Sequence, residues 1–168
     1  EFSKEDWTFS MRHCLKLCGM GLPMGLQYSI TAIGSVILQT AVNDMGSTYV
    51  AAVSAGSKIS MFMCCPFDAM GSTMATYGGQ NVGAKRLDRV DQGLKACIKM
   101  GIIYALVALA FSIVFGKQLA LLFVKKEQIE LIGYIYEFVV INAAFYIFLA
   151  LVNIVRFMIQ GLGYSTFA

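Results

Sequence analysis

The sequence is short of charge. Only 14% of its 168 residues are charged and 58% are hydrophobic, whereas ordinary soluble domains carry about 25% charged residues. The mean hydropathy is +0.68. A chain this apolar cannot hide its hydrophobic residues in a soluble core of its size, so we expect a membrane protein. The net charge of +3 is too small and too scattered to indicate nucleic-acid binding.

Proline and histidine are also scarce. Two prolines against 16 glycines suit closely packed spanning helices better than a loop-rich fold. The single histidine, His13, stands without a Ser–His arrangement, a His/Glu metal set or a phosphate-binding loop, so the sequence argues against an enzyme. Five cysteines are an odd number and give no disulfide framework. We therefore expect no catalytic residues and no metal site.

Long apolar runs dominate what remains. Each is long enough for a bilayer, which needs about 20 apolar residues per helix. The predicted fold is an all-α membrane protein with four transmembrane helices, at about residues 18–42, 49–77, 96–115 and 128–157. Residues 1–17 are predicted to be a cytoplasmic amphipathic segment, either a helix at the membrane interface or a plain linker. Residues 18–168 then form one transmembrane unit.

The second run, Tyr49–Tyr77, carries Lys58, Pro66 and Asp68 inside it. A charge costs free energy in hydrocarbon, so these residues are candidates for function. Asp68 is the candidate for a proton- or cation-responsive group, because burial favours its neutral form. The alternative is that Asp68 only pairs with Lys58 or another basic group. Pro66 removes a backbone hydrogen bond and is expected to kink the helix.

The first run carries a polar side chain at every fourth position, which places these side chains on one ridge of a helix. The ridge consists of Gln27, Thr31, Ser35, Gln39 and Asn43. The ridge lines an aqueous cavity, or it forms hydrogen bonds to neighbouring helices, each contributing about 1 kcal/mol or less. The predicted substrate-cavity residues are this ridge together with Lys58, Asn142 and Tyr146.

Small residues and basic residues give two further predictions. Gly71, Ala75 and Gly79 form a small-residue edge on the second run, where another helix can approach closely. Most basic residues outside the spans flank the start of the chain and residues 78–95. The excess of basic residues in cytoplasmic flanks places both of these segments in the cytoplasm.

Four short stretches resemble the multidrug and toxic compound extrusion (MATE) transporters. They are GLPMG at 21–25, AA at 51–52, GGQNVGAKRLDRV at 78–90 and RFMIQGLGYST at 156–166. The resemblance implies a twelve-helix bundle built from two six-helix lobes. It places this chain as the first four helices of the second lobe, with residues 1–17 similar to the linker between the lobes.

The resemblance also implies a function. Such a protein is an antiporter of the cell membrane, in which sodium ions or protons enter and organic, often cationic, compounds leave by alternating access. It needs no cofactor beyond that ion, and its partners are the lipid bilayer, a small organic substrate and the remaining lobe. The alternative is a non-transporting membrane subunit whose polar ridges only hold helices together.

Two acidic positions of similar proteins are not acidic here. Some relatives carry an acid on the first helix of this lobe, about two turns after the proline, where this chain has Thr31. An acid in the second half of the fourth helix is also missing, with Leu149 near that position and Asn153 one turn later. Either the coupling carboxylate lies in the remaining lobe, or another residue of this chain replaces it; the candidates for ion or proton coupling here are Asp68, Glu137 and Asn153.

Overall fold

The computed structural model describes residues 10–164, and over this range the chain is helical, without a strand. This confirms the predicted all-α fold class. The part of the predicted 1–17 segment before residue 10 lies outside the described residues. The helices are α1 Met11–Asp44, α2 Ser47–Gly83, α3 Leu87–Ala120, α4 Ile129–Ala144 and α5 Tyr146–Gly161.

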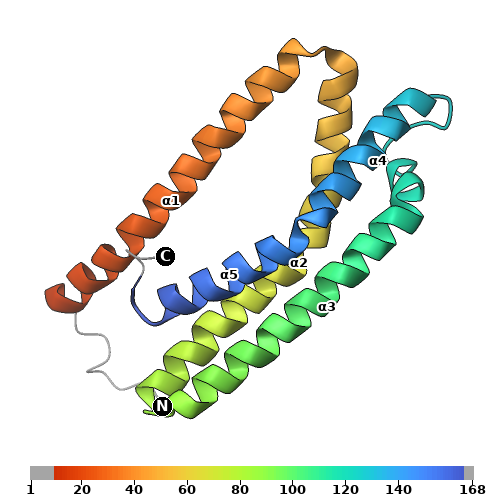
Figure 1. Cartoon of the computed structure of the whole chain (residues 1–168). Helices are drawn as coiled ribbons and strands as arrows, with labels where there is room; N and C mark the ends of the chain where they lie inside the picture. The colour runs from red at the N-terminus through yellow and green to blue at the C-terminus, as the bar shows by residue number, and fades with distance from the viewer. Residues whose placement is uncertain (1–9, 165–168) are drawn as a thin grey trace.

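The helices account for up to four membrane crossings in residues 10–164. α1, α2 and α3 are each long and apolar enough to cross a bilayer. α4 and α5 pass the same test together, as one span bent by 49°. The α1–α2 turn and the α3–α4 loop lie at one end of the molecule, and the α2–α3 turn lies at the other (Figure 1). Successive spans therefore run in opposite directions.

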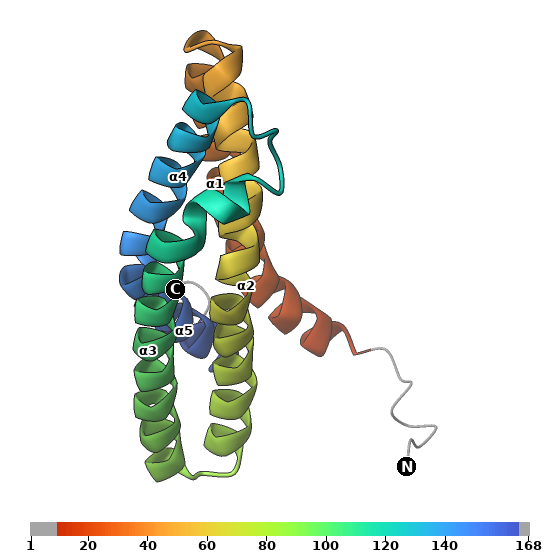
Figure 2. The same ribbon diagram turned by 90° about the vertical axis from the view of Figure 1, so that its right-hand side faces the viewer.

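α2 is the centre of the bundle. It packs against α3, α4 and α5, and these four helices form a compact group in both views (Figures 1 and 2). α1 approaches this group only at the turn that joins it to α2 and diverges from it toward its own N-terminus (Figure 1). Val42, near that turn, is the buried residue of α1. Most other apolar side chains of α1 are exposed, which suits contact with lipid or with another part of a membrane protein.

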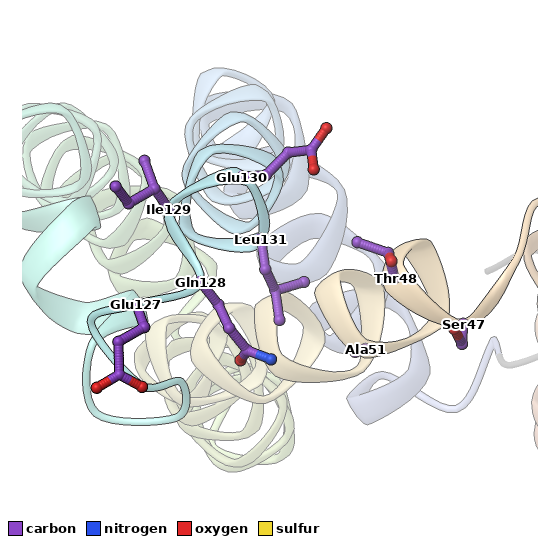
Figure 3. A pocket seen from close by; sticks show the side chains of 8 residues that line it. All are labelled: Ser47, Thr48, Ala51, Glu127, Gln128, Ile129, Glu130 and Leu131. Atoms are coloured by element: carbon purple, nitrogen blue, oxygen red, sulfur yellow. The ribbon is translucent and has the colours of Figure 1, made fainter.

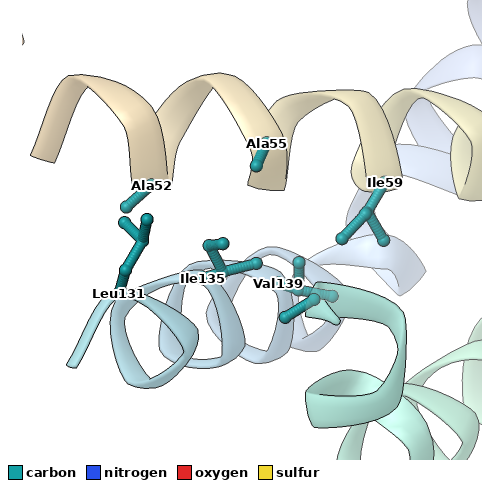
Figure 4. Close-up of a cluster of buried hydrophobic side chains, with 7 residues drawn as sticks. Ala52, Ala55, Ile59, Leu131, Ile135 and Val139 are labelled. Carbon is teal, nitrogen blue, oxygen red and sulfur yellow. The ribbon is translucent and has the colours of Figure 1, made fainter. Parts of the chain in front are cut away.

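Small and branched side chains build the core in three clusters along α2. Figure 4 shows the first cluster, where α2 meets α4. Its buried members are Ala52, Ala55, Ile59, Ala120, Leu131, Ile135 and Val139. The second cluster surrounds the fully buried Phe67, and the third contains Met74, Cys97 and Ile154. Alanines on α3 and α5 in the second cluster allow the helices to approach closely.

The predicted small-residue edge of α2 is confirmed as the contact with α5. The ring of Phe157 lies over Gly71, where a β-carbon would lie only 2.6 Å from Cδ2 of the ring. One turn on, Gly161 of α5 sits directly against the backbone of Ala75. A β-carbon at Gly79 would lie 3.1 Å from the carbonyl oxygen of Gly161. These glycines bring two helix backbones together.

The helix ends differ from the prediction. Residues 78–95 lie between the second and third predicted spans, and from their polarity we expect a loop there. In the structure α2 continues to Gly83 and α3 begins at Leu87, so only 84–86 remain between helices. The physical reason is that hydropathy reports where a helix leaves hydrocarbon, whereas backbone hydrogen bonds extend it into water. Lys85 makes the turn with a φ of 58°, in the left-handed region.

Two bends shape the bundle. α2 runs unbroken through Pro66, and Figure 1 shows it changing direction near its middle, as the missing backbone donor predicts. The second bend, between α4 and α5, occurs without a proline or glycine that would predict it from the sequence. There the amide of Phe145 donates to the carbonyl of Asn142 at 3.0 Å, a tightened turn of the i→i−3 type. The fourth predicted span is therefore two helices.

Candidate functional site

The structure brings Asp68 of α2 and Asn153 of α5 together. Nδ2 of Asn153 donates to Oδ1 of Asp68 at 2.9 Å, although the two residues are 85 positions apart in the sequence. Asn153 is buried, with 6% of its surface exposed, whereas Asp68 lies on the exposed side of the contact. Two of the three predicted coupling residues thus share one site.

Arg156 extends this contact. Its Nη2 donates to Oδ1 of Asn153 at 3.1 Å, and its guanidinium lies 4.8 Å from the centre of the Phe157 ring. The amide of Asn153 therefore joins a carboxylate to a guanidinium, donating to one and accepting from the other. We call this set the Asp68–Asn153–Arg156 chain. Asn153 engages Oδ1 of Asp68, and the amide separates the carboxylate from the guanidinium. The other carboxylate oxygen, Oδ2, therefore stays available to another partner.

Lys58 and Glu137 stand apart from this chain. In residues 10–164 the charged pair closer than 4.0 Å is Lys95–Asp91, at 2.6 Å, so Lys58 does not pair with Asp68 there. Lys58 is exposed on α2. Glu137 is exposed on α4, and the hydrogen bonds within the described part do not include it. The basic group that approaches Asp68 is Arg156, acting through Asn153.

The polar ridge of α1 is mostly satisfied within its own helix. The hydroxyl of Thr31 donates to the carbonyl of Gln27, and that of Ser35 to the carbonyl of Thr31, both at 3.0 Å. Nε2 of Gln39 donates to Oδ1 of Asn43 at 3.0 Å. All five side chains remain exposed or half-exposed in the described structure. The ridge therefore runs along an open side of α1.

Gln27 makes the one bond of this ridge to another helix within residues 10–164. Nε2 of Gln160, near the end of α5, donates to its Oε1 at 3.2 Å. This bond ties the middle of α1 to the end of α5, while the α1–α2 turn ties the end of α1 to α2. Gln160 has no role in the sequence-based predictions, because nothing in the sequence places it opposite Gln27.

The two remaining cavity candidates lie on either side of the α4–α5 bend. Asn142 is half-buried and its Nδ2 donates to the carbonyl of Phe138 at 2.8 Å, within its own helix. Tyr146 is 2% exposed and its ring packs edge-on against Phe67 at 5.5 Å between centroids. Tyr146 therefore belongs to the packed core and not to an open surface.

Comparison with known proteins identifies the family. A family model described as MatE matches residues 23–168, nearly the whole chain. The chain belongs to the MatE family. It is also 22% identical over 112 residues to the probable multidrug resistance protein YoeA of Bacillus subtilis (strain 168), covering 67% of this chain and 24% of that relative. The chain thus spans about a quarter of the length of the curated relative. No solved structure matches it.

One surface pocket of this MatE chain lies away from the Asp68–Asn153–Arg156 chain. It has a volume of about 480 Å³ and lies where the start of α2 meets the α3–α4 loop. Its lining consists of Ser47, Thr48, Ala51, Glu127, Gln128, Ile129, Glu130 and Leu131. Figure 3 shows the carboxylates of Glu127 and Glu130 pointing in different directions. Ala51 and Asp68 are 17 residues apart on α2, roughly 25 Å along a helix.

Sequence reasoning missed the role of Arg156. The signal was present, because Asn153 and Arg156 are three residues apart and therefore neighbours on one helix face. An ionisable residue inside an apolar run is a candidate for function by default. No group of three His, Cys, Asp or Glu side chains in the described range is arranged to hold a metal ion. The chemistry available at the site is therefore that of one carboxylate, one amide and one guanidinium.

Proposed function

We propose that the intact protein is an efflux antiporter of the cell membrane. It exports organic, often cationic, drugs or metabolites while sodium ions or protons enter. The observation that carries this proposal is the MatE match over residues 23–168, supported by the multidrug resistance name of the relative in Bacillus subtilis. The chain supplies the first four spans of the second lobe, and the remaining lobe completes the transport path.

Asp68 is the coupling group in this proposal. Its carboxylate lies where α2 contacts α5, and one of its oxygens accepts a hydrogen bond from Asn153. A cation or a proton that binds the other oxygen neutralises the carboxylate and weakens its attraction to Arg156. Coupling then means that binding of the cation or proton to Asp68 changes the hydrogen bonds that hold α5 against α2.

Alternating access supplies the motion. Antiporters of this kind expose a central site to one side of the membrane at a time by rocking one helical unit against another. In this chain α1 is attached to the bundle at its end, through the α1–α2 turn, and at its middle, through the Gln27–Gln160 bond. We propose that the ridge of α1 faces the path of the substrate between these attachments. The start of the chain and the α2–α3 turn face the cytoplasm.

Export of ethidium from cells that express the intact protein tests this function. Asp68→Asn removes the charge but keeps the shape and an acceptor for Asn153, so we expect export to stop while expression persists. Asp91→Asn is the matched control, because Asp91 is exposed and pairs with Lys95 on the surface. A surface pair contributes only about 0–1 kcal/mol, and export should continue.

The outcomes separate the alternatives. Equal export by Asp68→Asn and the unchanged protein removes Asp68 from the coupling role. If the unchanged protein exports none of a panel of organic cations, the non-transporting subunit becomes the better description. The coupling ion follows from the same assay, because export stops when the sodium gradient or the pH gradient that drives it is collapsed.

A further inference from the structure

An apolar groove runs between α2 and α3, near the turn that joins them. Its volume is about 310 Å³, at the lower end of the range of about 300–1,000 Å³ that small-molecule sites occupy. α2 and α3 lie side by side down to that turn in both views (Figures 1 and 2). The lining includes three methionines, Met70, Met74 and Met100, and the small Ala69 and Ala96. Methionine side chains are flexible, so they adapt to an irregular apolar ligand.

The groove offers a ligand few hydrogen bonds. The hydroxyl of Thr73 donates to the carbonyl of Ala69 in its own helix at 2.8 Å. The thiol of Cys97 donates to the carbonyl of Met70 at 3.9 Å, across the contact between α3 and α2. Since both of these polar side chains use their hydrogens within the protein, a hydrocarbon chain is the ligand that the lining fits.

Tyr77 lies at the end of the groove nearest the turn. Its ring lies over Gly93 of α3, where a β-carbon would overlap the ring, and its hydroxyl donates to the carbonyl of Arg89 at 3.2 Å. Tyrosine is common where hydrocarbon meets water, because its ring is apolar and its hydroxyl is polar. From Tyr77 the groove extends to Ala69, eight residues or about 12 Å along α2. One leaflet of hydrocarbon is about 15 Å thick, half of about 30 Å, so the groove spans most of a single leaflet.

Positive charge gathers beyond this end of the groove. Lys85, Arg86 and Arg89 are exposed, and none of them forms an ion pair in the described part of the chain. Asp88 is the one acid among residues 84–90, so the cations outnumber the acids by three to one there. A ligand with an anionic group at this end would therefore be attracted.

Arg89 shares a face of α3 with the groove. Three lining residues, Gly93, Ala96 and Met100, follow it by four, seven and eleven positions, which is the repeat of one helix face. A guanidinium binds phosphate oxygens through paired, charge-assisted hydrogen bonds. The apolar groove and the phosphate-binding group are thus in line along α3, as an amphiphilic ligand requires.

We propose that an anionic phospholipid binds here, with an acyl chain in the groove between α2 and α3 and its phosphate at Arg89, close to Lys85 and Arg86. Charge complementarity favours this occupant, because the basic end repels the organic cations of the proposed export and attracts a zwitterionic lipid less than an anionic one. Basic pockets between spanning helices at the cytoplasmic surface are typical sites for anionic head groups. The choice of leaflet rests on the proposed orientation, whereas the binding itself does not depend on export.

Native mass spectrometry of the intact protein in detergent tests the proposal. The protein is titrated with phosphatidylglycerol or with phosphatidylcholine of the same acyl chains, and the fraction that retains lipid is measured. We expect phosphatidylglycerol to be retained at a several-fold lower concentration. Arg89→Gln should weaken its binding about fivefold, since each basic residue near the surface contributes about 1 kcal/mol to the attraction of anionic lipids.

Lys95→Gln is the matched control for charge. It removes the same charge from the same helix, but Lys95 pairs with Asp91 at 2.6 Å and lies two residues from Gly93, on another face of α3. Its affinity for phosphatidylglycerol should stay close to that of the unchanged protein. Equal retention of the two lipids, or equal effects of Arg89→Gln and Lys95→Gln, overturns the proposal.

A second pair of variants tests the groove. Ala96→Phe fills the space between α2 and α3 and should weaken the binding of phosphatidylglycerol several-fold. Ala110→Phe is its control, because Ala110 is exposed on α3 outside the lining. An unchanged affinity in Ala96→Phe overturns the proposal, and so does retention of neither lipid, which would show that another part of the protein covers the groove. If Ala96→Phe does not fold, the two lipids and the two charge variants decide.

Discussion

Gly71→Ala tests whether α2 and α5 meet as closely as described. The new β-carbon would lie 2.6 Å from Cδ2 and 3.0 Å from Cγ of Phe157, well inside ordinary van der Waals contact. Both atoms belong to the ring at its attachment, so the ring cannot simply swing away without moving α5. Overpacking of this kind costs about 1–3 kcal/mol. We therefore expect Gly71→Ala to lower the free energy of unfolding by that amount.

The assay is reversible unfolding of the intact protein in mixed detergent and SDS micelles. Gly34→Ala is the matched control, because a β-carbon at Gly34 of α1 has no atom within 4 Å. Its stability should be unchanged or slightly higher, since alanine is the better helix former. A second variant, Gly71→Ala with Phe157→Leu, should regain part of the loss. If Gly71→Ala unfolds at the same SDS fraction as Gly34→Ala, the described contact between α2 and α5 is refuted.

Three further predictions follow from the contacts of the other polar residues. Asn153→Ala leaves the two charged groups of its chain without their shared amide, so we expect a loss of about 1–2 kcal/mol in the same unfolding assay; an unchanged midpoint would contradict the hydrogen bonds at 2.9 and 3.1 Å. Gln27→Cys combined with Gln160→Cys should form a disulfide under mild oxidation, which mass spectrometry detects. The control pair, Gln39→Cys with Gln160→Cys, should not form one. Equal disulfide yields from the two pairs would contradict the contact between α1 and α5. Lys85→Cys should react with a membrane-impermeant maleimide only from the cytoplasmic side, and reaction in intact cells would reverse the orientation.

The fold could largely be predicted from the sequence because hydrocarbon imposes a simple requirement on length and polarity. Four apolar runs predicted four crossings, and the edge of Gly71, Ala75 and Gly79 predicted a close helix contact that the structure assigns to α5. The bend at Phe145 could not be predicted, because it comes from backbone geometry between residues that all favour a helix. Helix ends were also missed, since hydropathy does not report where backbone hydrogen bonding stops.

The sequence predicted residues of the site, but it did not predict which of them contact one another. Asp68 stood out because an acid inside an apolar run is costly. Its partner depends on which face of α5 meets α2, and that face is set by the Gly71–Phe157 and Ala75–Gly161 contacts. Lys58 was the obvious counter-charge in sequence, yet it lies ten residues from Asp68 on the same helix. The group that does approach, Arg156, lies beyond Asn153 on another helix.

The hydrogen bonds within the α1 ridge determine which donors and acceptors remain free to bind a substrate. The hydroxyls of Thr31 and Ser35 use their hydrogens on carbonyls of their own helix, which is the usual arrangement for these residues inside spanning helices. Each hydroxyl oxygen keeps lone pairs free, so this part of the ridge presents acceptors and few donors. Oxygen acceptors attract cations and protonated amines, so Thr31 and Ser35 suit the cationic compounds of the proposed export. The amides of Gln27, Gln39 and Asn43 keep N–H donors as well, so the ridge as a whole offers both kinds of partner.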